Sequence, residues 1–144
     1  MTTNIPYFDR TFQHTNEWIV DMERQLHLEN RDNSFQALKA TLQALRDRMP
    51  ADEAVDFGSQ LPNLLAGYYY DNWIPAKTPV KTRQKDEFLR QIRDKLDDVD
   101  IGASEEEIAE AVFTVIEEHI SEGEVEDILG TLPDNIREMW KQPV

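Results

Sequence analysis

Apolar residues recur at helical spacing along almost the whole chain, and no stretch shows the sustained alternation typical of a half-buried strand. The two clearest stripes are Trp18, Ile19, Met22 and Leu26, and Phe35, Leu38, Leu42, Leu45 and Met49. The sequence therefore predicts an all-α fold. We expect the first of these helices to begin at Thr15 or Asn16, and the second to end before Pro50, because proline has no N–H to continue the helix.

The helical pattern is repeated within the chain. At a shift of 70, the first stripe returns as Phe88, Leu89, Ile92 and Leu96. At a shift of 71, Asn33 and Gln36 correspond to Ser104 and Glu107, which predicts a capping box at the start of both second helices. Further correspondences at this second shift are Glu53 with Glu124, Asp56 with Asp127, and Leu61-Pro62 with Leu132-Pro133. We infer about eight helices, arranged as two tandem, diverged four-helix repeats.

The repeat divides the chain into four segments. We expect an N-terminal arm at 1–15, the first repeat at 16–73, a linker at 74–85 and the second repeat at 86–144. Proline and four cations mark the linker as a solvated spacer, or alternatively as a cationic strip that folds back onto the second repeat; the cations are Lys77, Lys81, Arg83 and Lys85. Because units of about 60 residues bury marginal cores alone, the repeats are expected to form one compact body.

Negative charge is concentrated in the second repeat. The chain has a net charge of −14, and residues 86–144 hold 18 acidic and 5 basic residues. A solvated face with acids at helix starts accounts for much of this pattern. The alternatives are a docking surface for a basic protein partner, a nucleic-acid mimic, and adaptation to salt, although salt adaptation spreads acids over both halves. The docking candidates are Glu105, Glu106, Glu107, Glu117 and Glu118.

The sequence contains no recognisable catalytic constellation. Cysteine is absent, the three histidines belong to no metal-binding motif, and the five glycines form no phosphate-binding loop. Glu23 and His27, one helical turn apart, predict a surface contact rather than a metal site. We therefore expect no catalytic residue, no metal and no cofactor. The acidity argues against direct binding of nucleic acid, and no apolar run is long enough to span a membrane, so a cytoplasmic location is expected.

Two local features rise above this background. Arg46 and Arg48 flank an aspartate at the end of a predicted helix, where cations complement the helix dipole. An aromatic cluster, Tyr68 to Trp73, precedes the linker and is expected to pack between the repeats. The alternative is a binding surface or a small-molecule cleft between the repeats, lined by Arg46, Arg48, Gln60, Tyr68, Tyr69 and Trp73.

The same region resembles the bacterial family catalogued as domain of unknown function 2267. The resemblance runs from about Asn16 to Trp140 and is most specific between Leu45 and Pro75. Its motifs here are Leu45-Arg46-Asp47-Arg48-Met49-Pro50, Glu53-Ala54, Gln60-Leu61-Pro62, Gly67-Tyr68-Tyr69, Trp73 and Pro75, followed by Phe88-Leu89 and Gly123-Glu124. Ala66 departs from the pattern, because the family tends to place a basic residue there. The resemblance implies a small helical cytosolic protein and carries no assigned activity.

The leading hypothesis from the sequence is a non-catalytic helical interaction module whose acidic second repeat faces a basic partner. The rival is a small-molecule binding protein or enzyme that uses a cleft between the repeats. Self-association is a third hypothesis. The partner, the ligand and the physiological process are not encoded in any motif of the chain.

Overall fold

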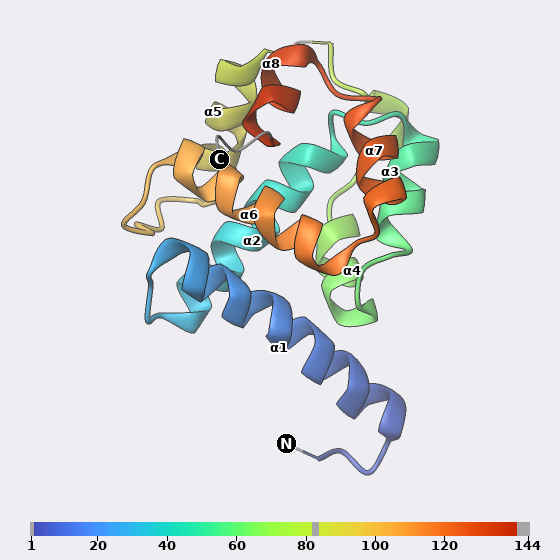
Figure 1. The fold of residues 1–144 in the computed structure, drawn as a ribbon, viewed down its shortest axis with the longest axis vertical. Coiled ribbons are helices and arrows are strands. Elements are labelled where there is room, and N and C mark those ends of the chain that lie inside the picture. The colour runs from blue at the N-terminus through green and yellow to red at the C-terminus, as the bar shows by residue number, and fades with distance from the viewer. Residues whose placement is uncertain (1, 82–83, 141–144) are drawn as a thin grey trace.

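The computed structural model describes residues 2–81 and 84–140, which contain α-helices, two short 3-10 helices and no strand. The prediction of an all-α fold of about eight helices in a compact body is confirmed (Figure 1). In chain order the elements are α1 (Pro6–Leu26), α2 (Arg31–Arg46), α3 (Ala51–Gly58), α4 (Asn63–Tyr70), η1 (Pro75–Lys77), α5 (Lys85–Lys95), α6 (Glu105–His119), α7 (Glu122–Leu129), α8 (Asp134–Arg137) and η2 (Glu138–Trp140).

Helix α1 begins at Pro6, well before the predicted start at Thr15. Pro6 occupies the first turn, where its fixed φ suits a helix and its missing N–H costs nothing. The Asp9 carboxylate accepts hydrogen bonds from the Thr3 backbone N–H at 2.8 Å and from its hydroxyl at 2.9 Å. The prediction that the helix starts at Thr15 or Asn16 is therefore wrong, because it used the apolar stripe and missed these local signals.

The first turns of α1 project from the rest of the molecule (Figure 1), and the helix meets α4 at Thr11, whose hydroxyl accepts the Leu64 N–H at 2.9 Å. Tyr7, Phe8 and Phe12 are exposed on this projecting segment. Further along the helix, Trp18 and Met22 are buried against the body. The helix therefore combines an anchored C-terminal half with an exposed aromatic N-terminal half.

The core is built around α2, and every residue from 40 to 49 is buried. Helices α1, α4, α5 and α6 all pack against it. Its N-cap is Asn30, whose side chain accepts the Asn33 N–H at 3.0 Å, so the capping box predicted at Asn33 and Gln36 is wrong. Asn30 is an equally good cap residue one turn earlier. The capping box predicted for α6, between Ser104 and Glu107, is confirmed.

Elements from the two halves of the chain pack across each other. Helix α1 packs on α6, α5 packs on α2, and α3 packs on α7. The bounds of α3 and α7 are related by the same shift of 71 as the sequence correspondence, and both Pro62 and Pro133 are N-caps. These contacts join the halves into one body, while the tandem repeat itself stays a prediction.

Most described residues of the predicted linker are exposed, and the linker meets the body near its end. It contains η1, and the Val80 N–H donates to the Asp47 carbonyl at 2.9 Å. Lys85 begins α5 and forms an ion pair with Glu106 at 2.8 Å. Arg83, one of the cations of the predicted strip, lies outside the described residues. Within the part of the chain that the structure describes, no helix combines the length and apolar character needed to cross a membrane.

Candidate functional site

The end of α2 carries a buried arginine that joins two parts of the chain. The Arg46 side chain is only 1% exposed. Its guanidinium donates to the carbonyls of Tyr69 at 2.7 Å and Asp71 at 2.9 Å, and to the Asp47 carboxylate at 2.9 Å. A planar guanidinium presents several donors in a fixed fork, which suits a cluster of carbonyls where a helix ends. Arg46 therefore secures the end of α4 against α2.

The neighbouring residues extend this contact to α5. The Gln91 side-chain amide donates to the Asp47 carboxylate at 2.7 Å, and its oxygen accepts a hydrogen bond from the Arg48 guanidinium. This guanidinium lies 5.2 Å from the centroid of the Phe88 ring. The Lys95 ammonium is 3.7 Å from the Asp47 carboxylate. Burial lowers the pKa of Lys95, the two nearby arginines lower it further, and Asp47 opposes them. The Asp47 carboxylate thus balances part of the positive charge of Arg46, Arg48 and Lys95.

The aromatic cluster packs inside the first half. Tyr69 is fully buried and donates its hydroxyl to the Ala54 carbonyl at 2.7 Å. Burial raises the pKa of Tyr69 far above its ordinary value, so the phenol stays protonated. The Tyr70 hydroxyl donates to Val55 at 3.2 Å, and its ring covers Gly58, where any side chain would collide with it. These contacts hold α4 against α3.

The six predicted binding residues are not brought together around one cavity. Arg46 and Tyr69 are buried in the contacts above, whereas Gln60 and Tyr68 are exposed and Trp73 is half-buried. Arg48 borders a cavity of about 360 Å³ between the end of the linker and α5. The structure gives Arg46, Arg48 and Tyr69 internal partners.

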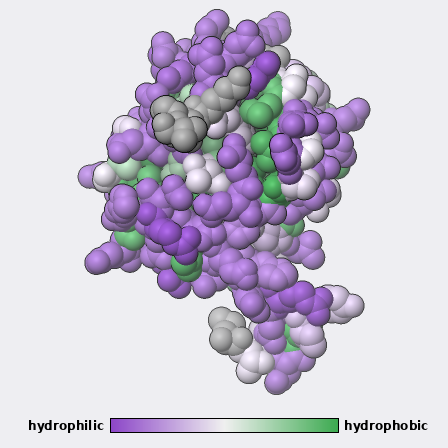
Figure 2. Space-filling view, viewed as in Figure 1, coloured by the Kyte–Doolittle hydropathy of each residue, from purple (hydrophilic) through white to green (hydrophobic). Residues whose placement is uncertain are grey.

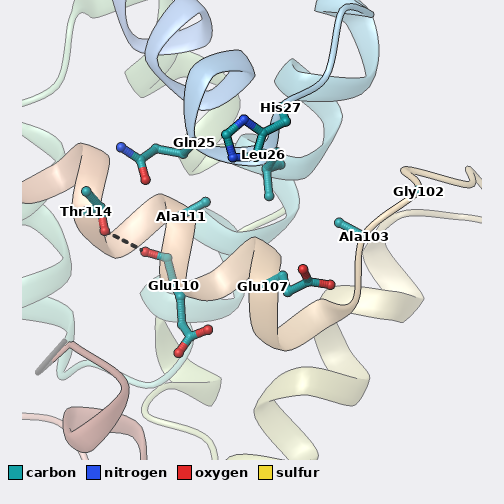
Figure 3. A pocket seen from close by; sticks show the side chains of 9 residues that line it. All are labelled: Gln25, Leu26, His27, Gly102, Ala103, Glu107, Glu110, Ala111 and Thr114. Atoms are coloured by element: carbon teal, nitrogen blue, oxygen red, sulfur yellow. Dashed lines mark hydrogen bonds between the residues drawn. The ribbon is translucent and has the colours of Figure 1, made fainter. Parts of the chain in front are cut away.

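A cavity of about 320 Å³ does lie between elements of the two halves, at the end of α1 and along α6. Figure 3 shows that the Glu110 carboxylate points away from His27 across this cavity. The Glu107 carboxylate accepts the Ser104 N–H at 3.0 Å, so it belongs to the helix cap. Because the ionisable groups do not converge, this cavity lacks the arrangement that acid–base chemistry requires.

A groove of about 440 Å³ lies between the end of α6 and α7. Its apolar lining comes from Ile120, Val125 and Leu129, and its rim carries glutamates 117, 122 and 126. Among the described residues, no cation lines this groove and none pairs with these glutamates. Figure 2 shows hydrophobic side chains gathered in a band beside α7. Burial raises the pKa of Glu117, which marks its partial removal from water.

The five predicted docking acids are divided among different contacts. Glu105 pairs with Arg93 at 3.2 Å, Glu106 pairs with Lys85, and Glu107 caps α6. Glu117 borders the α6–α7 groove, and Glu118 lies near Asp21 and His119. Sequence reasoning missed Glu122 and Glu126, although their spacing of one helical turn on α7 is the signal that places them on one face.

Carboxylates also meet where α3 packs on α7. Burial raises the pKa of Glu53, and the nearby carboxylates of Asp127, Asp56 and Glu124 raise it further. One Glu53 carboxylate oxygen is buried and accepts no hydrogen bond within the described part of the chain. The internal sequence correspondence pairs Glu53 with Glu124 and Asp56 with Asp127. Carboxylates at corresponding positions therefore lie close together where α3 packs on α7.

No curated protein matches the chain significantly. A protein-family model described as "Uncharacterized conserved protein (DUF2267)" matches residues 15–139. This match includes all of α2 to α8 and the anchored half of α1. The chain therefore belongs to this family of uncharacterised conserved proteins.

Proposed function

We propose that the protein is a non-catalytic interaction module that binds a basic, amphipathic helical segment of a partner protein. The α6–α7 groove is the docking site. The observation that carries the proposal is the combination of an apolar lining with three glutamates that no described cation neutralises. The cavity between the two halves offers no comparable set of convergent groups, which supports binding rather than catalysis.

The two components of the groove have separate roles in this proposal. Ile120 and Val125 are already buried and Leu129 is half-buried, so they offer a docking apolar helix face only a small area to remove from water, and the rim charges supply much of the affinity. Glutamates 117, 122 and 126 attract and orient the cations that flank such a face. Because screening weakens exposed charge contacts, salt reduces the second contribution and leaves the first.

The probe for the test is a synthetic amphipathic helix of leucine and lysine, about 14 residues long. Its binding is measured by fluorescence anisotropy at low and high salt. Replacing the three rim glutamates together (Glu117→Gln, Glu122→Gln and Glu126→Gln) is expected to weaken binding about tenfold at low salt, since three exposed ion pairs are lost.

The matched control makes the same change of net charge elsewhere, with Glu17→Gln, Glu29→Gln and Asp52→Asn, all exposed and outside the groove. This control protein is expected to bind the peptide nearly as well as the parent. An equal loss in both triple variants means that the peptide responds to net charge alone, and the docking site is then rejected. A second variant, Val125→Thr, is expected to weaken binding at both salt concentrations, because it places a hydroxyl in the apolar lining.

A further inference from the structure

Three metal-ligating side chains meet where α1 crosses α6, outside the proposed docking groove. They are Asp21 from α1 and the adjacent pair Glu118 and His119 at the end of α6. One ligand atom from each residue lies within 4.8 Å of the other two. Asp21 and His119 are 98 positions apart in the sequence, so only the folded chain assembles this group.

The orientation of two of the three side chains is fixed by neighbouring contacts. The His119 ring stacks on Trp18 with ring centroids 4.8 Å apart and an interplanar angle of 18°. Trp18 is itself 3% exposed, so it provides a rigid support. His119 Nε2 lies 2.6 Å from Asp21 Oδ2, while Arg24 donates to Asp21 Oδ1 at 2.7 Å. Such outer contacts orient ligands in established metal sites.

We propose that Asp21, Glu118 and His119 bind a divalent transition-metal ion, with Zn²⁺ as the representative, and that the ion joins α1 to α6. One imidazole nitrogen and two carboxylate oxygens form a mixed set that suits Zn²⁺, Ni²⁺ or Co²⁺. The bound ion replaces the hydrogen bond between His119 and Asp21, and water completes its coordination. The two carboxylates balance its charge.

The same ligand chemistry argues against Mg²⁺ or Ca²⁺ as the preferred ion. Both are hard cations that favour six or more oxygen ligands, and an imidazole contributes little to them. The remaining histidines, His14 and His27, are absent from this group. Metal selectivity is therefore part of the proposal and provides a direct readout.

The test uses the full-length protein after removal of metals with a chelator, titrated with Zn²⁺ by calorimetry and followed by thermal unfolding. One ion is expected to bind per chain. At a free concentration about 100 times the Kd, Zn²⁺ is expected to raise the Tm by about 5–10 °C, because the ion binds only the folded arrangement. The same concentration of Mg²⁺ is expected to leave the Tm unchanged.

His119→Gln and Glu118→Gln are each expected to abolish the Zn²⁺-dependent rise in Tm. His14→Gln, at an exposed position on α1, is the matched control and is expected to retain it. Glu118 is exposed and forms no ion pair within the described residues, so its variant keeps the proposal testable if His119→Gln fails to fold. Unchanged binding of Zn²⁺ to both variants, or an equal response to Mg²⁺, overturns the proposal.

This metal site is independent of the proposed docking groove. The groove variants at Glu117, Glu122 and Glu126 are expected to keep the Zn²⁺ response, and His119→Gln is expected to keep peptide binding. Failure of one proposal therefore leaves the other standing, and the two sets of variants distinguish them.

Discussion

The internal sequence correspondence pairs the C-terminal ends of α2 and α6, and these two ends have opposite chemistry. Arg46-Asp47-Arg48 ends α2, and Glu117-Glu118-His119 stands at the corresponding end of α6. The first triplet is buried and the second is exposed. Positions that the sequence correspondence relates thus support the interior in one half and form accessible surface in the other.

The difference follows from what covers each helix end. Val80 of the linker and Gln91 of α5 both bond to Asp47, and the end of α4 bonds to Arg46. At the end of α6, the groove and the Asp21–His119 contact remain at the surface. Internal polar groups must be fully paired, whereas exposed ones are free to meet a partner or an ion. The predictions below test this contrast.

The largest expected effect comes from Arg46→Met. The change leaves the carbonyls of Tyr69 and Asp71 and the Asp47 carboxylate without their buried partner. We expect a loss of about 3–5 kcal/mol in the free energy of unfolding, measured by urea denaturation followed by circular dichroism. The corresponding change Glu117→Met on α6 is expected to alter stability by less than about 0.5 kcal/mol. Similar losses at the two positions contradict the contrast.

The ends of α3 and α7 provide a second pair through their glycines. A Cβ at Gly58 would collide with the Tyr70 hydroxyl and lie 3.0 Å from the Tyr69 ring, whereas one at Gly130 meets nothing closer than 3.5 Å. Gly58→Ala is expected to cost about 1–3 kcal/mol. The backbone at Gly130 is helical. Gly130→Ala is therefore expected to be neutral or to stabilise by about 0.4–1 kcal/mol. Thermal and urea unfolding of both variants measure the difference, and equal effects reject the packing argument.

Tyr69 and Tyr70 are adjacent in the sequence and differ in their hydrogen bonds. The bond of Tyr69 is buried, whereas that of Tyr70 is exposed. Tyr69→Phe removes the donor to the buried Ala54 carbonyl, whereas Tyr70→Phe removes a longer, exposed hydrogen bond. Because the Ala54 carbonyl lies within α3 and keeps its helical partner, losing the buried hydrogen bond is expected to cost about 1–1.5 kcal/mol. Losing the exposed bond is expected to cost about 0.5 kcal/mol, because water replaces the donor. Urea unfolding of the matched pair tests this order, and a larger loss for Tyr70→Phe contradicts it.

The smallest expected effect is the pH dependence contributed by Glu53. Its pKa is raised in the folded protein, so the folded state binds the proton more tightly than the unfolded state. The stability that protonation provides is therefore present at acid pH and is lost as the pH rises above about 4.5 through the folded pKa. Glu53→Gln is expected to unfold at higher urea than the parent at pH 7 and to match it near pH 4.

The exposed change Glu17→Gln serves as the control for this experiment. It is expected to leave the difference in stability between pH 4 and pH 7 close to that of the parent. If Glu53→Gln and Glu17→Gln have the same pH profile, the crowding of carboxylates between α3 and α7 contributes nothing to stability, and the prediction fails.

Local interactions explain how far sequence reasoning reached. The apolar stripes, the stop at Pro50 and the capping box at Ser104 act within one or two helical turns, and each is visible in the chain itself. The start of α1 was missed because hydrogen bonds to Asp9, rather than an apolar stripe, hold its first turn. The Arg46 motif was recognised, but its partners, 23 and 25 residues away, were not visible from spacing.

By itself, the sequence determined the helical fold, the concentration of acids in the second half and the absence of a recognisable catalytic motif. Only the tertiary structure decided that the end of α2 is an internal contact, that the end of α6 borders a groove, and that Asp21 meets His119. The physical reason is range. Helix formation depends on neighbours a few residues apart, whereas burial and ligand geometry depend on which distant segments pack together.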